Sequence, residues 1–94
     1  MKNLEDIKID LVPLLRSNGV LRSFVFGSYA RNEAQEGSDL DLLLSFRERK
    51  SLLDLVALQL LLKEKLGMEV DIVTEESLHP KVKAYIERDK IQVL

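Results

Sequence analysis

Apolar and polar residues alternate along this chain with two different periods, and the changes of period predict its elements. From Leu4 to Leu15, apolar residues recur every three or four positions, which is the spacing of a helix buried on one face. Asn3 is a suitable N-cap for this helix, and Asn18-Gly19 is a suitable stop. Pro13 lacks the N–H that a helix interior needs, so we expect it to kink or split the helix.

Three short apolar runs predict strands, because each is rich in Val, Leu, Ile or Phe and is bounded by polar or turn-forming residues. The runs extend from Val20 to Phe26, from Asp39 to Phe46, and from Met68 to Val73. The second is almost continuously apolar at its centre, as expected of an interior strand. Residues Ile91 to Leu94 should form a short terminal strand or a docked tail.

Helices are predicted between these strands. A short one should cover Ser28 to about Glu33. A leucine-rich one should run from Ser51, which has the capping-box spacing to Asp54, as far as Leu66. A last one should run from His79, a structural cap followed by proline, to about Arg88.

This order of elements predicts an α/β (α+β) fold, a small mixed β-sheet flanked by helices. The chain has 94 residues, close to the smallest size that folds alone, and we expect residues 1–94 to form a single domain. The short connection between the first two strands allows them to lie antiparallel.

Composition and charge narrow the classes of function. Hydrophobic residues make up 46% of the chain, which is enough for a core, and the formal net charge is −2. Proteins that bind nucleic acid through its backbone are normally basic, so we expect no direct nucleic-acid contact. Cysteine is absent, which excludes disulfides and thiolate metal sites. Neither a long apolar run nor a signal-peptide pattern is visible, so we expect a cytoplasmic protein without a membrane contact.

The most specific chemistry lies between the first two predicted strands. Gly27-Ser28 ends the first, and Asp39 and Asp41 begin the second. Side chains alternate along a strand, so the two carboxylates project the same way, and such a pair is costly to keep ionised without a cation. A Gly-Ser turn that opens a helix offers N–H groups and a hydroxyl to an anion. Together these features predict a site for a metal-bound nucleoside triphosphate, with oxygen ligands of the kind that Mg²⁺ prefers.

This pattern, with Asp71 inside a later apolar strand, resembles the nucleotidyltransferases of the DNA polymerase beta superfamily. Its spacing and brevity are most similar to the minimal nucleotidyltransferases, the MNT proteins often paired with HEPN-domain toxins. The resemblance covers nearly the whole chain. It implies a nucleotidyltransferase catalytic core with the carboxylates on one open face of the sheet.

The resemblance also implies a role for each residue of the pattern. Asp39 and Asp41 would hold two Mg²⁺ ions, with Asp41 bridging them, and Asp71 would be the third catalytic carboxylate and metal ligand. The residues implied to bind the triphosphate of ATP are Gly27, Ser28 and Arg31. Tyr29 and Asn32 depart from the family, which often has a basic residue and a glycine there, and the change at Tyr29 removes one phosphate contact or alters the base pocket.

Simpler structural roles compete with these assignments. Gly27-Ser28 is also the pattern of an ordinary strand-to-helix cap. Asp39 is also placed to pair with Arg31 or Arg22 near a strand edge. Asp71 fits a solvent-facing strand position, and Arg31 fits a solvated helix position.

The expected function is Mg²⁺-dependent transfer of AMP from ATP to a protein hydroxyl. By resemblance, the acceptor is a tyrosine of a cognate HEPN ribonuclease toxin, which makes this chain the antitoxin of the pair. Two alternatives stay open: the catalytic subunit of a small-molecule nucleotidyltransferase, and a non-catalytic antitoxin that acts by binding alone.

The leucine-rich helix predicted from Ser51 to Leu66 also indicates a protein binding partner. Its apolar residues between Leu52 and Leu62 are too many to face one sheet at 3.6 residues per turn. Some should therefore lie in a second interface. We expect that interface to contact the toxin-like partner, with a homodimer as the alternative.

Overall fold

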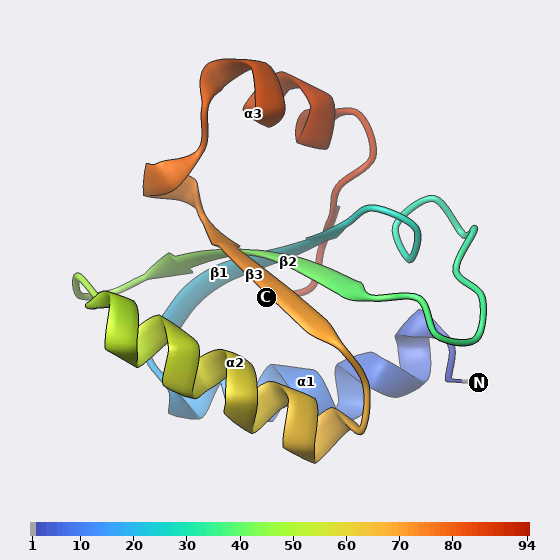
Figure 1. Ribbon diagram of the computed structural model, residues 1–94, viewed down its shortest axis with the longest axis horizontal. Coiled ribbons are helices and arrows are strands. Elements are labelled where there is room, and N and C mark those ends of the chain that lie inside the picture. Colours follow the sequence, from blue (N-terminus) through green and yellow to red (C-terminus); the bar gives the residue numbers. More distant parts are fainter. Residues whose placement is uncertain (1) are drawn as a thin grey trace.

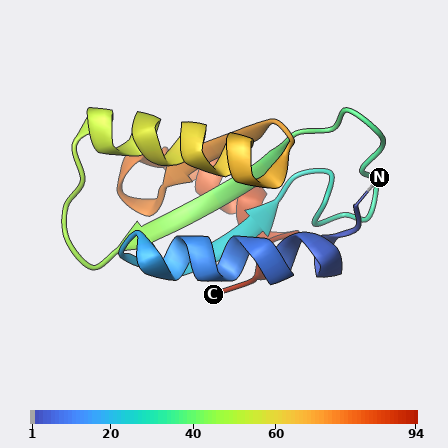
Figure 2. The same cartoon turned by 90° about the horizontal axis from the view of Figure 1, so that it is seen from below.

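The computed structural model describes residues 2–94, which form one four-stranded sheet with helices on both faces (Figure 1). The elements in chain order are α1 (Leu4–Ser17), β1 (Val20–Phe26), β2 (Leu40–Phe46), α2 (Leu52–Leu66), β3 (Val70–Thr74), the 3-10 turn η1 (Glu75–Ser77), α3 (Pro80–Glu87) and β4 (Ile91–Gln92). Helices α1 and α2 lie side by side across one face (Figure 2), and α3 stands over the other (Figure 1). Among residues 2–94, no helix is both long and apolar enough to cross a membrane.

The sheet is mixed, as predicted. Its strand order is β3-β2-β1-β4, with β1 antiparallel to both β2 and β4, and β2 parallel to β3. The antiparallel pairing of the first two strands is thereby confirmed, and α2 makes the crossover that a parallel pair requires. The expected terminal strand is β4, and the tail beyond it continues the pairing, since Val93 N donates to Ser23 O at 2.9 Å.

One face of the sheet carries the core. Alternate residues of β2, with Val25 and Val70 on its neighbours, point toward α1 and α2 and are fully buried. The helices contribute the matching apolar side chains, which recur at helical spacing. The buried apolar residues that pack in this layer include Ile7, Leu11, Leu15, Leu40, Leu42, Leu44, Leu58, Leu62 and Leu66. The opposite face, under α3, buries Leu43 of β2 and also carries polar side chains.

Several predicted boundaries need correction. Helix α1 is one continuous helix through Pro13, so the predicted split is wrong. Pro13 is exposed and lies off the buried face of α1, where water can satisfy the carbonyl that loses its N–H partner. The second strand begins at Leu40 and not at Asp39, and the third runs from Val70 to Thr74. His79 caps α3 as predicted, because its Nδ1 accepts from Lys81 N at 3.1 Å.

The predicted capping box of α2 is confirmed. Asp54 N donates to Ser51 Oγ at 3.1 Å, and Ser51 N donates to Asp54 Oδ2 at 3.0 Å. The bond donated by Ser51 N, and after it the nearby hydroxyl of Ser51, lower the pKa of Asp54 because they favour its charged form. The capping box therefore contributes its full stability at pH values above the ordinary pKa of an aspartate. This contribution is lost as the pH falls through the lowered pKa of Asp54.

We expect Ser51→Ala to lower the free energy of unfolding by about 1 kcal/mol, because the N–H of Asp54 loses its acceptor. Urea denaturation at neutral pH measures this change. Ser51→Thr keeps a hydroxyl at the cap and is the matched control, which should retain most of the stability. An alanine variant as stable as the parent would mean that water replaces the cap without cost.

Candidate active site

The Gly27-Ser28 segment forms a tight turn at the end of β1, and the helix predicted over residues 28–33 is absent. Gly27 O accepts from Arg31 N at 3.1 Å, and Ser28 O accepts from Glu33 N at 2.8 Å. The second bond spans five residues, and Asn32 takes a positive φ of 58°, so the chain leaves the helical path after one turn. Asn32 tolerates this left-handed conformation better than most residues. Asn32 therefore ends this helical turn in the way that a left-handed glycine commonly ends a helix.

Gly27 and Asp41 are in direct contact. Gly27 has a φ of +73°, and a Cβ added to it would collide with Oδ2 of Asp41 and lie 3.2 Å from its Cγ. The strand register explains the contact, since Phe26 is paired with Asp41 across β1 and β2. Only a residue without a side chain allows the backbone of the turn and this carboxylate to approach so closely.

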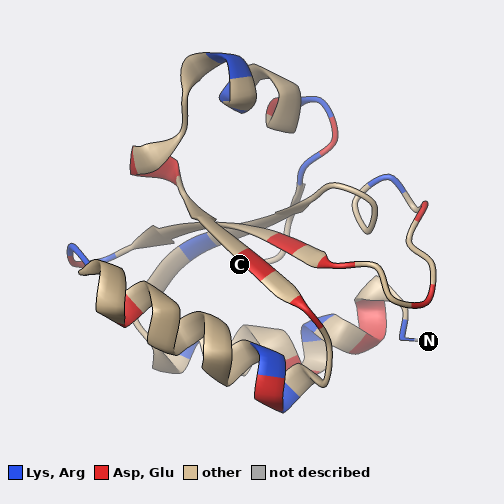
Figure 3. Cartoon of the chain, in the orientation of Figure 1, with Lys and Arg blue, Asp and Glu red and all other residues tan. Residues whose placement is uncertain are grey.

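Asp41 and Asp71 lie side by side on the sheet. They are partners in the parallel register of β2 and β3, so both side chains project from the face opposite the buried leucines. Figure 3 shows acidic residues, in red, at the beginnings of these two strands. The prediction that Asp71 shares a face with Asp41 is confirmed.

Asp39 lies one residue before β2, where the ladder does not fix its side chain. It is exposed, and its charge acts on Asp41. Among residues 2–94, however, no three carboxylates or imidazoles gather closely enough to hold a metal ion between them. Mutual repulsion of like charges opposes that convergence. The three predicted ligands are therefore neighbours and not a preassembled cage.

The electrostatics single out Asp41. Its pKa is raised, first by burial and then by the charges of Asp71 and Asp39, while Arg31 has a smaller opposite effect. The carboxylate of Asp41 thus lies near other negative charges, and Arg31 offsets their effect only weakly. A group held in this way is a candidate for a functional role, because its charge adds nothing to stability.

Arg31 is engaged by two carboxylates. Its Nε contacts Glu33 at 3.2 Å and its Nη1 contacts Asp89, beyond α3, at 3.8 Å. Arg22 pairs with Glu75 at 3.2 Å, so the suggested pairing of Asp39 with Arg31 or Arg22 is not formed in the described part of the chain. Arg31 belongs to the turn and not to a helix, yet it is close enough to Asp41 to lower that pKa.

Sequence reasoning missed Lys63, and it left open where the side chain of Tyr29 lies. Lys63, in the last turn of α2, pairs with Glu69 at 2.8 Å, and Asp71 and Asp39 help to raise its pKa. In the sequence it looks like an ordinary basic residue at a helix end, so no signal could have found it. Tyr29 is buried with the core cluster and does not stand among the phosphate-binding candidates.

Comparison with known proteins identifies the class that this fold and site define. Residues 5–93 match the model of the nucleotidyltransferase domain family. A solved structure assigned as a minimal nucleotidyltransferase superposes with a TM-score of 0.80 at 42% identity, covering 96% of this chain and 95% of that one. The three helices and mixed sheet are thus the minimal nucleotidyltransferase fold, and the chain belongs to the nucleotidyltransferase domain family.

The chain is also similar to individual named members of this family. A Methanocaldococcus jannaschii protein assigned as a protein adenylyltransferase is 50% identical over 92 residues, which cover 98% of this chain and 99% of the relative. Protein adenylyltransferase MntA of Thermococcus cleftensis is 41% identical over 75 residues, which cover 80% of this chain and 76% of MntA. A chain in the crystal structure of a toxin–antitoxin with AMP-PNP has a TM-score of 0.84 at 21% identity, covering 93% and 72% of the two chains, and it shows the shared fold alone.

Proposed function

We propose that this chain is a protein adenylyltransferase that transfers AMP from ATP to a tyrosine hydroxyl of a HEPN-type toxin and thereby acts as its antitoxin. The observation that carries the proposal is the 50% identity to an assigned protein adenylyltransferase over almost the full length of both chains. A chain in the structure of a tri-AMPylated Shewanella oneidensis HEPN toxin in complex with MNT antitoxin has a similar fold, at 20% identity and a TM-score of 0.78, which is consistent with the proposal. We propose a cytoplasmic location, where ATP is available.

The site fits Mg²⁺, because Asp41 lies beside two further carboxylates and its raised pKa reflects a charge that the chain leaves weakly compensated. We propose that Asp39 and Asp41 hold two Mg²⁺ ions, with Asp71 as the third carboxylate. When bound, such ions neutralise charge at the α-phosphate and on the leaving pyrophosphate.

The residues of the chain supply binding, orientation and proton transfer. Ser28 Oγ and the N–H groups of its turn donate to a phosphate oxygen. Arg31 exchanges its contact with Glu33 or Asp89 for the triphosphate. A carboxylate oxygen of Asp71 accepts the proton of the attacking hydroxyl. The hydroxyl oxygen then bonds to the α-phosphorus, the bond from that phosphorus to the bridging oxygen breaks, and pyrophosphate leaves with the electron pair.

The exposed stripe of α2 supports a protein partner. Leu52, Leu53, Val56 and Leu60 are 76%, 80%, 46% and 59% exposed, whereas Leu58, Leu62 and Leu66 face the core. The expectation that α2 has more apolar residues than the sheet can cover is thus confirmed. We propose that the exposed stripe contacts the toxin-like partner, since an apolar strip of this kind commonly marks a protein interface.

One experiment separates the proposal from its two alternatives. The chain is expressed together with the product of its neighbouring gene, and the partner's intact mass is measured with and without ATP and Mg²⁺. One or more added adenylyl groups would support protein adenylylation. A bound but unmodified partner would favour the binding-only antitoxin, and transfer to a small molecule with no change in the protein would favour the small-molecule enzyme.

Ser28→Ala should raise the KM for ATP about tenfold to a hundredfold, because a hydrogen bond to a charged phosphate contributes roughly 1.5–3 kcal/mol. Partner binding should be unaffected, since the partner contacts a broader surface. Steady-state kinetics in ATP measure the effect, and Ser17→Ala at the end of α1 is the control. Unchanged kinetics would assign Ser28 to the turn alone.

A further inference from the structure

Helix α3 brings an exposed tyrosine to the candidate active site. The helix stands over the face of the sheet that carries Asp41 and Asp71, and the chain beyond it descends beside the turn that follows β1 (Figure 1). Ile86 is the buried residue of α3, whereas Tyr85, the residue before it, is 58% exposed. Consecutive residues lie about 100° apart around a helix, so Tyr85 projects from the side of α3 while Ile86 faces the rest of the protein.

Two observations place Tyr85 next to Arg31. Helical bonding continues as far as Asp89, whose N–H donates to Ile86 O at 3.2 Å, so Tyr85 and Asp89 lie one turn apart on the same side. Asp89 in turn contacts Nη1 of Arg31 at 3.8 Å. The pKa of Arg31 is raised first by its bond to Glu33. Tyr85 and Asp89 raise this pKa further, and the effect of Tyr85 is the larger of the two, as expected of a phenol oxygen close to the guanidinium.

The hydroxyl of Tyr85 is available to a ligand. Within residues 2–94 it makes no hydrogen bond, although Arg31 beside it is engaged by the carboxylates of Glu33 and Asp89. A phenol O–H and a guanidinium both donate to phosphate oxygens. Tyr85 and Arg31 therefore form a pair of neighbouring donors, one from α3 and one from the turn after β1.

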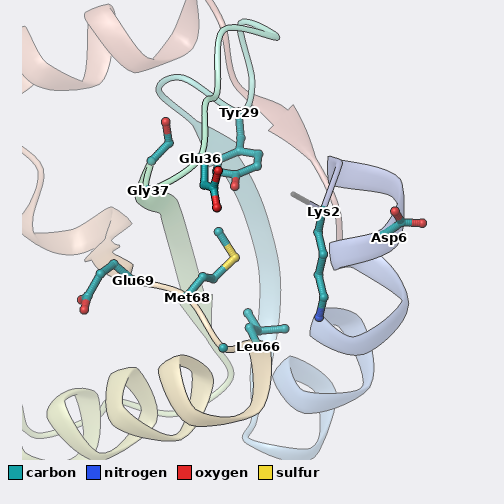
Figure 4. A pocket seen from close by; sticks show the side chains of 10 residues that line it. Lys2, Asp6, Tyr29, Glu36, Gly37, Leu66, Met68 and Glu69 are labelled. Carbon is teal, nitrogen blue, oxygen red and sulfur yellow. The ribbon is translucent and has the colours of Figure 1, made fainter.

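The second tyrosine of the chain has no such position. Tyr29 is only 8% exposed and packs with the core cluster. It lines a cavity of about 480 Å³ together with Leu66 and Met68 (Figure 4). Of the two tyrosines, Tyr85 is thus the one that lies beside a proposed phosphate-binding residue.

The side of the reaction on which Tyr85 lies decides what it can do. Ser28 and Arg31 are proposed to hold the triphosphate, of which the β- and γ-phosphates leave as pyrophosphate. In an in-line displacement, the attacking hydroxyl approaches the α-phosphorus from the opposite side. A phenol beside Arg31 therefore lies with the leaving group, where it can donate a hydrogen bond, and not where an acceptor attacks.

We propose that Tyr85 is a further ATP-binding residue, whose hydroxyl donates, beside Arg31, to the part of the triphosphate that leaves as pyrophosphate. The inference rests on the proposed function and adds to its site a residue from α3. Negative charge grows on the leaving group as its bond to the α-phosphorus breaks, so this hydrogen bond is stronger in the transition state than in bound ATP.

Calorimetric titration with inorganic tripolyphosphate and Mg²⁺ tests the contact without depending on transfer. Tyr85→Phe keeps the ring and removes the hydroxyl, so it should weaken tripolyphosphate binding about tenfold, since the acceptor is charged. Binding of AMP, which lacks the leaving phosphates, should stay the same. Tyr29→Phe, the same change at the buried tyrosine, is the control. Unchanged tripolyphosphate binding by Tyr85→Phe, or an equal loss of AMP binding, would overturn the proposal.

Asp89→Asn distinguishes a direct contact from a disturbance of α3. It removes the ion pair between α3 and Arg31, so an effect that acts only through the placement of α3 should weaken binding in this variant too. A direct contact predicts the opposite sign. Tripolyphosphate binding should tighten, by up to about fivefold, because a carboxylate that competes for Arg31 is gone. Weaker binding by both Tyr85→Phe and Asp89→Asn would overturn the proposal.

Kinetics connect Tyr85 to the reaction. Tyr85→Phe should lower kcat/KM for ATP about tenfold and leave the KM for the acceptor constant. Intact mass should show no adenylyl group on the chain itself, and an adenylyl group on Tyr85 would overturn the proposal by making this residue an acceptor. Tripolyphosphate binding that depends on Tyr85, in a parent protein that transfers no AMP, would contradict the proposed function alone.

Discussion

Replacing Asp41 with asparagine should reduce AMP transfer by about a thousandfold or more and at the same time stabilise the metal-free protein. The first effect follows because metal ions contribute several kcal/mol to the transition state, and this variant loses the central carboxylate that would hold them. The second follows because burial and the charges of Asp71 and Asp39 raise the pKa of Asp41, so its ionisation opposes folding. Asparagine removes the charge with almost no change of volume.

The stability that Asp41→Asn gains over the parent protein should increase with pH. The pKa of Asp41 is higher in the folded protein than in the unfolded chain, so the cost of its charge is absent below the ordinary aspartate pKa, near 3.9. That cost develops as the pH rises through the raised pKa and is fully present at neutral pH. The stability advantage of Asp41→Asn should therefore grow over this window and then level off.

Two measurements on one variant check these results. Denaturation in the absence of divalent cations, repeated from acidic to neutral pH, gives the stability difference, and partner mass after incubation with ATP gives transfer. Asp10→Asn, an exposed position on α1, is the control and should change neither. Full transfer by the Asp41 variant would remove this carboxylate from the reaction, and lower stability at neutral pH would mean that it is compensated within the fold.

Sequence patterns predicted correctly those elements and contacts that depend on residues close together in the chain or on adjacent strands. An apolar run between turn-forming residues gave β1 its bounds, from Val20 to Phe26, and the spacing of Ser51 and Asp54 predicted the capping box of α2. The shared face of Asp41 and Asp71 followed from alternation once β2 and β3 were taken as neighbours. In each case the decisive residues lie on the same element or on adjacent strands.

The errors have different physical causes. The helix expected after Ser28 failed because one left-handed residue, Asn32, ends it, and the φ of an asparagine cannot be read from sequence. The split expected at Pro13 failed because the lost hydrogen bond falls on the solvent side of α1. The place of Lys63 near the candidate carboxylates could not be foreseen, since its approach to Asp39 depends on segments that only the tertiary fold joins.

Gly27→Ala should be among the most damaging single substitutions in the chain, lowering the free energy of unfolding by about 2–5 kcal/mol. Two costs add: a left-handed φ of +73° is unfavourable for alanine by roughly 1–2 kcal/mol, and overpacking against the Asp41 carboxylate costs roughly 1–3 kcal/mol more. Transfer should fall with stability, because the displaced carboxylate is the one proposed to bind metal. Chemical denaturation and the transfer assay measure the two losses.

The two costs can be separated within the same chain. Gly37 has a φ of +88° with nothing within 4 Å of an added Cβ, so Gly37→Ala should show the strain alone, about 1–2 kcal/mol. Combining Gly27→Ala with Asp41→Ala removes the carboxylate that the new methyl group meets, so the cost of Gly27→Ala should shrink to that of Gly37→Ala in this background. Such coupling between two contacting residues is what a double-mutant cycle detects. Equal costs of Gly27→Ala with and without the Asp41 carboxylate would contradict the direct contact between them, and with it the reason that glycine is required at this turn.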